Sequence, residues 1–502
     1  MPEDQALPIV YLRGYAGDQG GVEGTVDDPF YGFNTGSTHI RVGPRGSATF
    51  FAFEGPLIRL ASDYRYGDAY VDGVQVGTPQ APEGASGAVP LRMIWIHRYY
   101  DLTSQTFAGS PGRRLEIEDA AAELRTLIRE IKRLTGAPRV VLLGHSTGGL
   151  IIRSLLQRGY PDAGEKATEH VDRVFTYGAP HGGIHFDIPG GLTLEWFRDT
   201  LGWHNVDDFG LERMYRYLTP LAEQRKKVPD RWDPRDLGTF PPERFFSLVG
   251  TDAADYGLPK RAVGVRSDGL VQIESAYVKG GPRAYVHRAH SGRYGLVNSE
   301  EGYQNLKRFL FGDVRVEIFL DGLDHIERLG DRPDRFHQAE VSVAVRGLPV
   351  VMHEQTIEHY CPVPLEWKKE QQGEPIFLFT LFLIPKLAGD RPARYAVSLA
   401  VHRFERREGR LWTRDHLEKI PLWTDNLIVD LFSVQDRDGR TSYTARYAWR
   451  SEMPQPDADP STGLVTAATK DGKEEGRIAL PDNARAVLGD RAVLVVRASR
   501  WA

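Results

Sequence analysis

The sequence predicts two architectures in one chain: an α/β region with a doubly wound, mostly parallel sheet, and then an all-β, sandwich-like region. Up to about Asp313, apolar runs typical of strands alternate with helical patterns, as in a parallel sheet with crossover helices. From Val314 onward, apolar residues recur at every second position, which is typical of half-buried strands. A length of 502 residues leaves room for two or three domains. We therefore expect one domain over residues 1–312 and a second over residues 313–502.

Short apolar runs predict the strands of the first domain. They lie at Ile9–Leu12, Met93–Ile96, Val140–Leu143, Val171–Tyr177, Phe245–Val249 and Ala284–His287. A helix is predicted from about Leu115 to Leu134, because apolar residues recur there at helical spacing while Arg and Glu occupy the other face. Gly136 and Pro138 end this helix. A further helix is expected over Glu300–Phe311.

Residues 182–242 interrupt the alternation of strands and helices. This stretch is too long for a plain connection, and it includes an amphipathic piece around Leu211–Leu218. The insertion is predicted to be helical. It could form a lid over a site, or a small helical subdomain packed on the core.

The second domain is predicted from alternating apolar runs. They lie near 314–318, 341–345, 376–384, 394–402, 426–434, 441–449 and 491–497. Asp438-Gly439 is a typical hairpin turn, and the segment 453–476, rich in Pro, Asp, Gly and Lys, is predicted to be a long loop. The aromatic residues could form a stacking platform, but core packing is the expected role of Trp412, Trp423, Tyr443, Tyr447 and Trp449.

Composition excludes several classes of protein. Lys and Arg number 63 against 68 Asp and Glu, a net charge of -5 that does not favour nucleic acid or acidic lipid as the main partner. The lone Cys361 allows neither an intramolecular disulfide nor a multi-cysteine zinc site. The N-terminus has no signal-peptide pattern, and the longest apolar run, Ile376–Ile384, is too short to span a bilayer. We expect a soluble, cytoplasmic protein, although a disulfide-free secreted enzyme would have the same composition; the oligomeric state is left open.

The strongest chemical signal is the pentapeptide Gly144-His145-Ser146-Thr147-Gly148. A buried-strand run precedes it and a helical pattern follows it, so Ser146 is expected on a sharp strand-to-helix turn that exposes its hydroxyl. Side chains at the flanking glycines would collide with the neighbouring strand and helix. Ser146 is therefore the predicted nucleophile.

A serine that attacks an acyl group needs N–H donors for the developing oxyanion. One is expected from Thr147, the residue after the nucleophile. The other is expected from the loop after the first strand, where Gly14 lets the chain turn and Tyr15 is the candidate donor.

Four segments resemble the α/β-hydrolase fold, specifically bacterial lipases and esterases: residues 8–17, 140–150, 171–183 and 263–311. Arg13 stands where those lipases usually have a histidine before the glycine. The segment Val174-Phe-Thr-Tyr-Gly-Ala-Pro-His-Gly-Gly-Ile184 is similar to the strand and trailing Thr-Pro-His-Gly segment of lipases. The resemblance covers about 310 residues and none of the C-terminal domain.

In this fold the acid follows the nucleophile in the chain and the base follows the acid. Ser267-Asp268-Gly269 resembles the acid-bearing motif of bacterial lipases, so Asp268 is the first choice, with Asp252 and Asp255 as rivals. For the base we favour His290, which lies 22 residues after Asp268, and hold His287 in reserve.

These residues predict a serine carboxylic ester hydrolase that works through an acyl-enzyme on a small-molecule, lipid or polymeric ester. The alternatives are an amidase or acyltransferase with the same triad, or a non-catalytic binding or scaffold protein of this fold. No cofactor is expected. Many such lipases hold a calcium ion through an aspartate shortly after the base, but Ser291, Gly292 and Arg293 follow His290 here, so no metal is expected.

Overall fold

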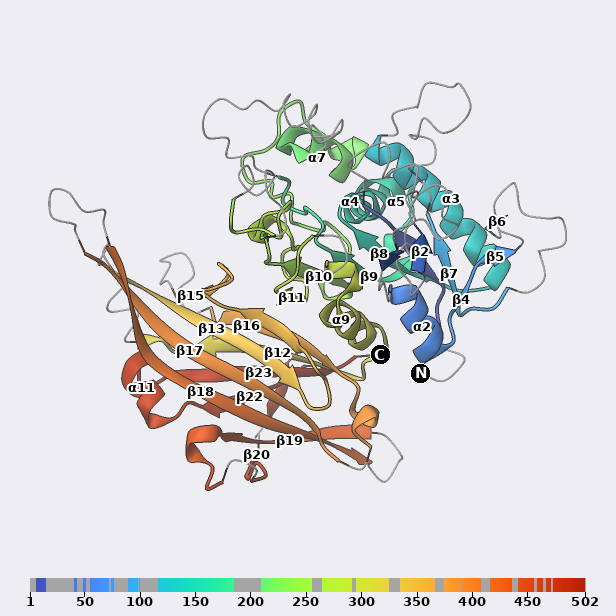
Figure 1. Ribbon diagram of the computed structural model, residues 1–502. Coiled ribbons are helices and arrows are strands. Elements are labelled where there is room, and N and C mark those ends of the chain that lie inside the picture. Colours follow the sequence, from blue (N-terminus) through green and yellow to red (C-terminus); the bar gives the residue numbers. More distant parts are fainter. Residues whose placement is uncertain are drawn as a thin grey trace. The chain divides into compact units, whose positions relative to one another are not determined.

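The computed structural model describes residues 6–14, 40–42, 48–50, 55–71, 74–75, 89–97, 99, 116–184, 209–254, 264–290, 295–324, 335–365, 374–389, 391–407, 416–435, 441–455, 458–463, 466–470 and 473–501 (Figure 1). The chain forms two compact units. The first comprises Met1–Arg283 with Arg288–Tyr303, and the second comprises Ala284–His287 with Gln304–Ala502. Each unit is described by itself.

The α/β part of the chain is built on a seven-stranded sheet. Its strand order is β11-β10-β9-β8-β1-β7-β4, and the pairs from β10 to β4 are parallel. The strands are β1 (Ile9–Leu12), β4 (Gly67–Asp68), β7 (Met93–Ile96), β8 (Val140–His145), β9 (Val171–Tyr177), β10 (Phe245–Gly250) and β11 (Arg283–Val286). All six predicted strands are present, and β4 is added at one edge. Short hairpins outside this sheet are formed by β2 (Ile40–Val42) with β3 (Ala48–Phe50), and by β5 (Tyr70–Val71) with β6 (Val74–Gln75).

The central strand β8 explains why the apolar runs were recognisable. It lies between β1 and β9, and all six of its residues are buried. Parallel strands that are covered on both faces need an uninterrupted apolar sequence.

Helices lie between these strands in the chain, and α9 follows the last of them (Figure 1). They are α2 (Pro56–Tyr64), α3 (Ile117–Thr135), α4 (Thr147–Ser154), α5 (Tyr160–Asp162), α7 (Leu211–Leu218) and α9 (Glu300–Phe311). The predicted helix at about 115–134 corresponds to α3, which buries Ala120, Leu124, Ile128 and Ile131. It ends where Gly136 adopts a left-handed conformation (φ +70°) and donates its N–H to the carbonyl of Lys132.

The described part of the 182–242 insertion includes the predicted helix α7. This helix buries Met214, Tyr217 and Leu218, and Arg213 forms ion pairs with Glu116 and Glu118 at the start of α3. The insertion is therefore held to the first unit by both apolar packing and charge. Residues 185–208 lie outside the described residues, and a lid stays a prediction.

The second unit contains two antiparallel sheets. One has the order β16-β12-β23-β22-β21, and the other has the order β14-β13-β17-β18-β19-β20, with β15 paired to β13. The strands are β12 (Val314–Asp321), β13 (Arg335–Val345), β14 (Val351–Gln355), β15 (Val363–Pro364), β16 (Ile376–Leu383), β17 (Ala393–Arg407), β18 (His416–Gln435), β19 (Thr441–Trp449), β20 (Thr462–Gly463), β21 (Thr466–Lys470), β22 (Lys473–Ala479) and β23 (Val493–Arg500).

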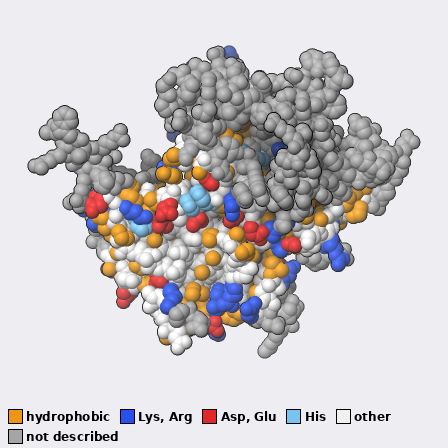
Figure 2. All heavy atoms as spheres, in the orientation of Figure 1, with side chains coloured by type: hydrophobic (Ala, Val, Ile, Leu, Met, Phe, Trp, Pro, Cys, Tyr) orange, Lys and Arg blue, Asp and Glu red, His pale blue; other side chains and the backbone are white. Residues whose placement is uncertain are grey.

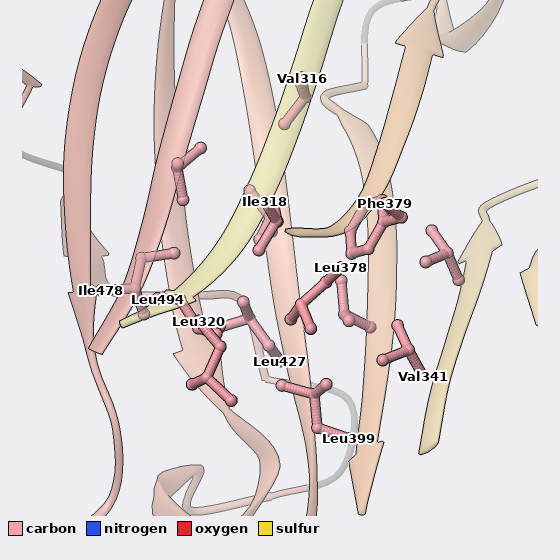
Figure 3. Close-up of a cluster of buried hydrophobic side chains, with 14 of the residues drawn as sticks. Val316, Ile318, Leu320, Val341, Leu378, Phe379, Leu399, Leu427, Ile478 and Leu494 are labelled. Carbon is pink, nitrogen blue, oxygen red and sulfur yellow. The ribbon is translucent and has the colours of Figure 1, made fainter. Parts of the chain in front are cut away.

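The inner faces of the two sheets form one apolar core. Val316, Ile318 and Leu320 from β12 belong to the same buried cluster as Leu399 from β17 and Leu427 from β18 (Figure 3). Packing alternate residues between two sheets is the arrangement of a β-sandwich. The predicted all-β, sandwich-like architecture is confirmed.

The aromatic residues of this unit pack in or against that core. Trp423 and Trp449 are buried, and Tyr443 and Tyr447 pack against the core. The indole N–H of Trp449 donates to the carbonyl of Ala479 at 2.8 Å. Core packing was therefore the correct expectation for these four residues, while Trp412 lies outside the described residues.

The long loop predicted over 453–476 is wrong. The segment contains β20, β21 and the start of β22, and β21 pairs with β22 through Lys470 and Lys473. These strands lie at or near a sheet edge, where charged residues are favoured, so their composition resembles that of a loop. The structure also adds the unpredicted helix α11 (Asp482–Leu488). The predicted Asp438-Gly439 turn lies outside the described residues, although the flanking residues Gln435 and Thr441 are paired.

Charged side chains of both signs are interspersed over the described surface in the view of Figure 2. This distribution agrees with the small net charge of the chain. Among the helices that the structure describes, none has the length and apolar character required to cross a membrane.

Candidate active site

The predicted site residues follow the carboxyl ends of neighbouring strands. Ser146 follows β8, Asp268 lies in the segment between β10 and β11, and His290 lies after β11. In open α/β sheets, ligands bind at this edge of the sheet.

Ser146 occupies the turn between β8 and α4 in a strained conformation. Its backbone angles are φ +53° and ψ −124°, a region that residues with a side chain rarely adopt. Its N–H donates to the carbonyl of Tyr177 at 3.0 Å, which ties the turn to β9. Ser146 is partly exposed, while His145 and Thr147 on either side are buried. The strain is of the kind that persists at functional sites because the surrounding structure holds it.

Close packing explains the glycines on either side of this turn. A Cβ atom on Gly144 would lie 2.8 Å from Ile152 Cδ1 in α4, and one on Gly148 would lie 2.5 Å from the carbonyl oxygen of Leu12 in β1. Both distances are shorter than a side chain tolerates. The helix and the neighbouring strand therefore leave no room for side chains here, for the reason expected from the sequence.

The segment after β1 lies directly against the turn that carries Ser146. A Cβ atom on Gly14 would lie 2.7 Å from Ser146 Cβ and 3.2 Å from His145 Nδ1. Tyr15, the predicted donor, lies outside the described residues. Thr147 begins α4, so its N–H is among those that have no acceptor within the helix.

Asp268 and His290 are in direct contact. His290 Nδ1 lies 2.8 Å from Asp268 Oδ2, and the His290 N–H donates to the backbone carbonyl of Asp268 at 2.9 Å. The other carboxylate oxygen, Oδ1, accepts the N–H groups of Leu270 and Val271. Asp268 is 0% exposed and His290 is 3% exposed, so this pair is held away from water.

The reserve candidates lie elsewhere. Asp252 uses Oδ1 to accept the N–H of Ala254 at 2.8 Å, a local turn contact. His287 is exposed and belongs to the second unit, where its ring stacks on that of His359 with 3.6 Å between the ring centroids. The geometry thus brings His290, rather than His287, against Asp268. The rival Asp255 lies outside the described residues.

Two further residues contact this pair, and sequence reasoning missed both roles. Gly178, directly after β9, has φ +51°, and a Cβ atom there would lie 2.8 Å from Asp268 Oδ2 and 3.1 Å from His290 Nδ1. His145 Nε2 lies 3.0 Å from the backbone carbonyl oxygen of His290, and the two rings are 5.0 Å apart. A glycine at the carboxyl end of a central strand was the available signal for Gly178. His145 carried none beyond its place before the serine.

The helix that follows Ser146 is anchored by a fully buried arginine. Arg153 donates Nη1 to the carbonyl of His181 at 2.9 Å, Nη2 to the carbonyl of Asp236 at 2.8 Å, and Nε to Gln157. Burial lowers the pKa of Arg153 to about 10, so the side chain still carries its charge at neutral pH. These bonds connect α4 to the loop after β9 and to the described end of the insertion.

The arrangement has the parts that nucleophilic catalysis requires. A serine is exposed on a strained turn at the start of a helix, and a histidine whose Nδ1 is bonded to a buried carboxylate lies on the same edge of the sheet. A carboxylate in this position fixes the imidazole tautomer and leaves Nε2 to exchange protons with a hydroxyl.

The family of the chain follows from comparison with known proteins. A model described as the alpha/beta hydrolase family matches residues 78–339, which is more than half of the 502 residues. The chain belongs to this family, and the predicted α/β-hydrolase fold is confirmed. No curated protein matches the chain as a sequence relative.

The solved structures that the chain resembles include a lipase, a bacterial gene product and epoxide hydrolases. The mature Bacillus licheniformis lipase BlEst2 is 16% identical with a TM-score of 0.32, covering 62% of this chain and 93% of that one. A Listeria innocua gene product is 14% identical with a TM-score of 0.26, covering 61% and 94%. Epoxide hydrolases from hot-environment metagenomes are 13% identical with a TM-score of 0.24, covering 61% and 92%. At these values the family assignment rests on the family model alone.

Proposed function

We propose that the protein is a serine carboxylic ester hydrolase that works through an acyl-enzyme. Ser146 Oγ attacks the ester carbonyl while His290 takes the hydroxyl proton and then delivers it to the leaving alcohol. Asp268 holds His290 in the tautomer that leaves Nε2 free to act. The same histidine then activates a water molecule that releases the acid.

The observation that carries this proposal is the strained turn at Ser146 on the same sheet edge as a buried acid–histidine pair. The positive φ of Ser146, in a sparsely populated backbone region, costs about 1–3 kcal/mol, a penalty that a serine without a role would not require. Asp268 and His290 are in contact at 2.8 Å, and their exposed fractions are 0% and 3%. Such burial is unusual for two titratable side chains unless they are paired.

The N–H groups of Thr147 and Tyr15 would stabilise the oxyanion of the tetrahedral intermediate. Thr147 supports this role through its place at the first position of α4, where the helix dipole favours negative charge. Removing one such donor usually lowers kcat by about two to three orders of magnitude.

Covalent labelling tests the nucleophile. A fluorophosphonate probe should label the wild-type protein at Ser146 and should not label Ser146→Ala. Ser342→Ala, which changes a serine on β13 of the second unit, is the matched control and should be labelled like the wild type. An unlabelled wild-type protein would favour a binding or scaffold role.

Substrate preference tests the reaction. We expect hydrolysis of p-nitrophenyl esters by the wild type and by Ser342→Ala, and none above background by Ser146→Ala. Matched anilides and added acceptor alcohols should be run beside the esters. Faster turnover of the anilides, or alcohol products exceeding hydrolysis, would contradict the ester hydrolase and indicate an amidase or an acyltransferase.

A further inference from the structure

We propose that His145 is a positioning residue that fixes the peptide carbonyl of His290 to the strand carrying the nucleophile. This inference rests on the proposed function, in which His290 is the general base. It assigns to His145 a role that does not involve contact with the substrate.

The hydrogen bond defines the protonation state of His145. The carbonyl oxygen of His290 can only accept, so the Nε2 of His145 carries the proton and donates it over 3.0 Å. In the neutral ring its Nδ1 is then the unprotonated nitrogen. Burial, and then the nearby His290, hold the pKa of His145 well below its usual range, so the ring stays neutral and the donor stays in place at neutral pH.

This bond completes the constraints on the base. The His290 N–H is bonded to the carbonyl oxygen of Asp268, and its Nδ1 is bonded to Asp268 Oδ2. Both contacts fix the position of His290 relative to Asp268, but not relative to Ser146.

Neighbouring backbone bonds, from the Asp252 N–H to the Arg288 carbonyl and from the Leu296 N–H to the Ala289 carbonyl, likewise stay among the segments that follow β10 and β11. These bonds alone would let the segments shift together relative to the serine. His145 directly precedes Ser146 in the chain. Its bond to the His290 carbonyl therefore fixes the position of His290 relative to Ser146.

The surroundings of the ring leave it little freedom. His145 is 8% exposed, and its Nδ1 faces the end of β1, where a Cβ atom on Gly14 would lie 3.2 Å away. The His290 ring lies 5.0 Å from the His145 ring at an interplanar angle of 39°. The ring thus fills the space between the first strand's end and the base. A displacement of about 1 Å at a reacting group can cost about a hundred-fold in rate, so such a constraint matters for catalysis.

Two variants separate the hydrogen bond from the filling of space. His145→Leu keeps an apolar side chain of moderate size but removes the donor. His145→Gln retains an N–H donor at a comparable distance along the side chain. Circular dichroism and thermal unfolding establish which variants fold.

The first readout does not depend on activity. In the wild type, the proton shared between His290 Nδ1 and Asp268 should give a downfield proton NMR resonance, assigned by its loss in His290→Gln. We expect that resonance to broaden or disappear in His145→Leu and to persist in His145→Gln. An unchanged resonance in folded His145→Leu overturns the proposal. If His145→Leu does not fold, a lost resonance in folded His145→Gln overturns it equally, and a retained one supports it.

The second readout is the split between kcat and KM on a soluble p-nitrophenyl ester. Because the bond positions the base and does not contact the substrate, His145→Leu should lower kcat by about ten- to hundred-fold while KM changes by less than about three-fold. His145→Gln should recover most of that loss. A wild type with the downfield resonance but no esterase activity would refute the proposed function and leave the positioning role supported.

Discussion

Asp268 and His290 are joined twice, once through their side chains at 2.8 Å and once from the His290 N–H to the Asp268 carbonyl at 2.9 Å. The second contact fixes the backbone from which the imidazole projects, and the first fixes the ring itself. Two loops on neighbouring strands are thereby held as one unit at the sheet edge. Because the backbone bond already sets the distance between the two loops, the side chain of Asp268 matters through the acceptor that it presents to His290 Nδ1.

Replacing Asp268 by Asn should preserve the fold and abolish most activity. The amide has nearly the volume of the carboxylate and would leave the backbone contact intact, but it favours the wrong tautomer of His290. We expect kcat on a p-nitrophenyl ester to fall by about 10³- to 10⁴-fold with little change in KM. Asp252→Asn is the control, because the Asp252 carboxylate serves a local turn, and it should retain wild-type kinetics. Equal losses in the two variants would argue against Asp268.

Gly178→Ala should disable the acid–base pair. The new methyl group would lie 2.8 Å from Asp268 Oδ2 and 3.1 Å from His290 Nδ1, and the φ of +51° adds backbone strain. We expect ester hydrolysis to fall by at least about a hundred-fold. Gly164→Ala is a matched control, since its φ of +70° carries similar strain but nothing lies within 4 Å. It should lose about 1 kcal/mol of unfolding free energy and no activity. The prediction fails if both variants show the same kinetics.

Arg153→Met should destabilise the first unit. The change leaves the His181 carbonyl oxygen and Gln157 Oε1 without their buried donor, at a cost of about 2–4 kcal/mol in the free energy of unfolding, while the Asp236 carbonyl keeps its bond from Gln157 Nε2. Urea titrations measure this loss. Arg129→Ala removes an exposed ion pair to Glu165 and should cost less than about 0.5 kcal/mol. A tolerated Arg153→Met would mean that water takes over the hydrogen bonds of the His181 carbonyl and of Gln157 Oε1.

The first unit should lose stability as the pH falls below about 6.5. Burial lowers the pKa of His97 to about 4, while the unfolded chain titrates near 6.5. Between these values the unfolded state binds more protons, so the free energy of unfolding rises with pH. Through His97 alone, the free energy of unfolding should be about 2 kcal/mol lower at pH 5 than at pH 7. Burial lowers the pKa of His145 and His181 in the same direction.

His97→Gln isolates this contribution. The amide can still donate to the carbonyl of Ala120, as His97 Nε2 does at 3.0 Å, but it cannot titrate. Urea titrations at several pH values should show a flatter dependence for the variant than for the wild type. Parallel curves for the two proteins would exclude His97 as a source of the acid sensitivity.

Local sequence was sufficient to predict the central strands of the parallel sheet and the turn at Ser146. Val140–His145 is buried on both faces, and a strand of this kind needs a continuous apolar run, which is easily detected in the sequence. The turn at Ser146 depends on glycines adjacent in the chain, so its signal is also local. In contrast, β21 and β22 were missed, because charged residues near a sheet edge resemble a loop in composition.

The assembly of the site depends on contacts that no local pattern encodes. Asp268 and His290 could be proposed from their order in the chain, but Gly178 approaches them from β9, a strand far away in sequence. The same holds for His145, which bonds to the backbone carbonyl of residue 290. Every residue type has such a carbonyl, so the sequence at position 290 does not indicate this contact. Such contacts appear only when the strands are placed side by side.

The position of β23 has a consequence for how the second unit is made. β23 (Val493–Arg500) lies between β12 and β22, so its sheet cannot close until a strand synthesised about 180 residues after β12 has emerged. At ribosomal rates of roughly 5–20 residues per second, β12 waits about 10–40 s for its neighbour. During that interval β12, which carries the apolar side chains Val316, Ile318 and Leu320, lacks its β23 partner, so the backbone groups along that edge of the strand are unpaired. Slower translation before residue 493 should therefore raise aggregation of the nascent chain, while the first unit, which is already complete by Tyr303, should be spared.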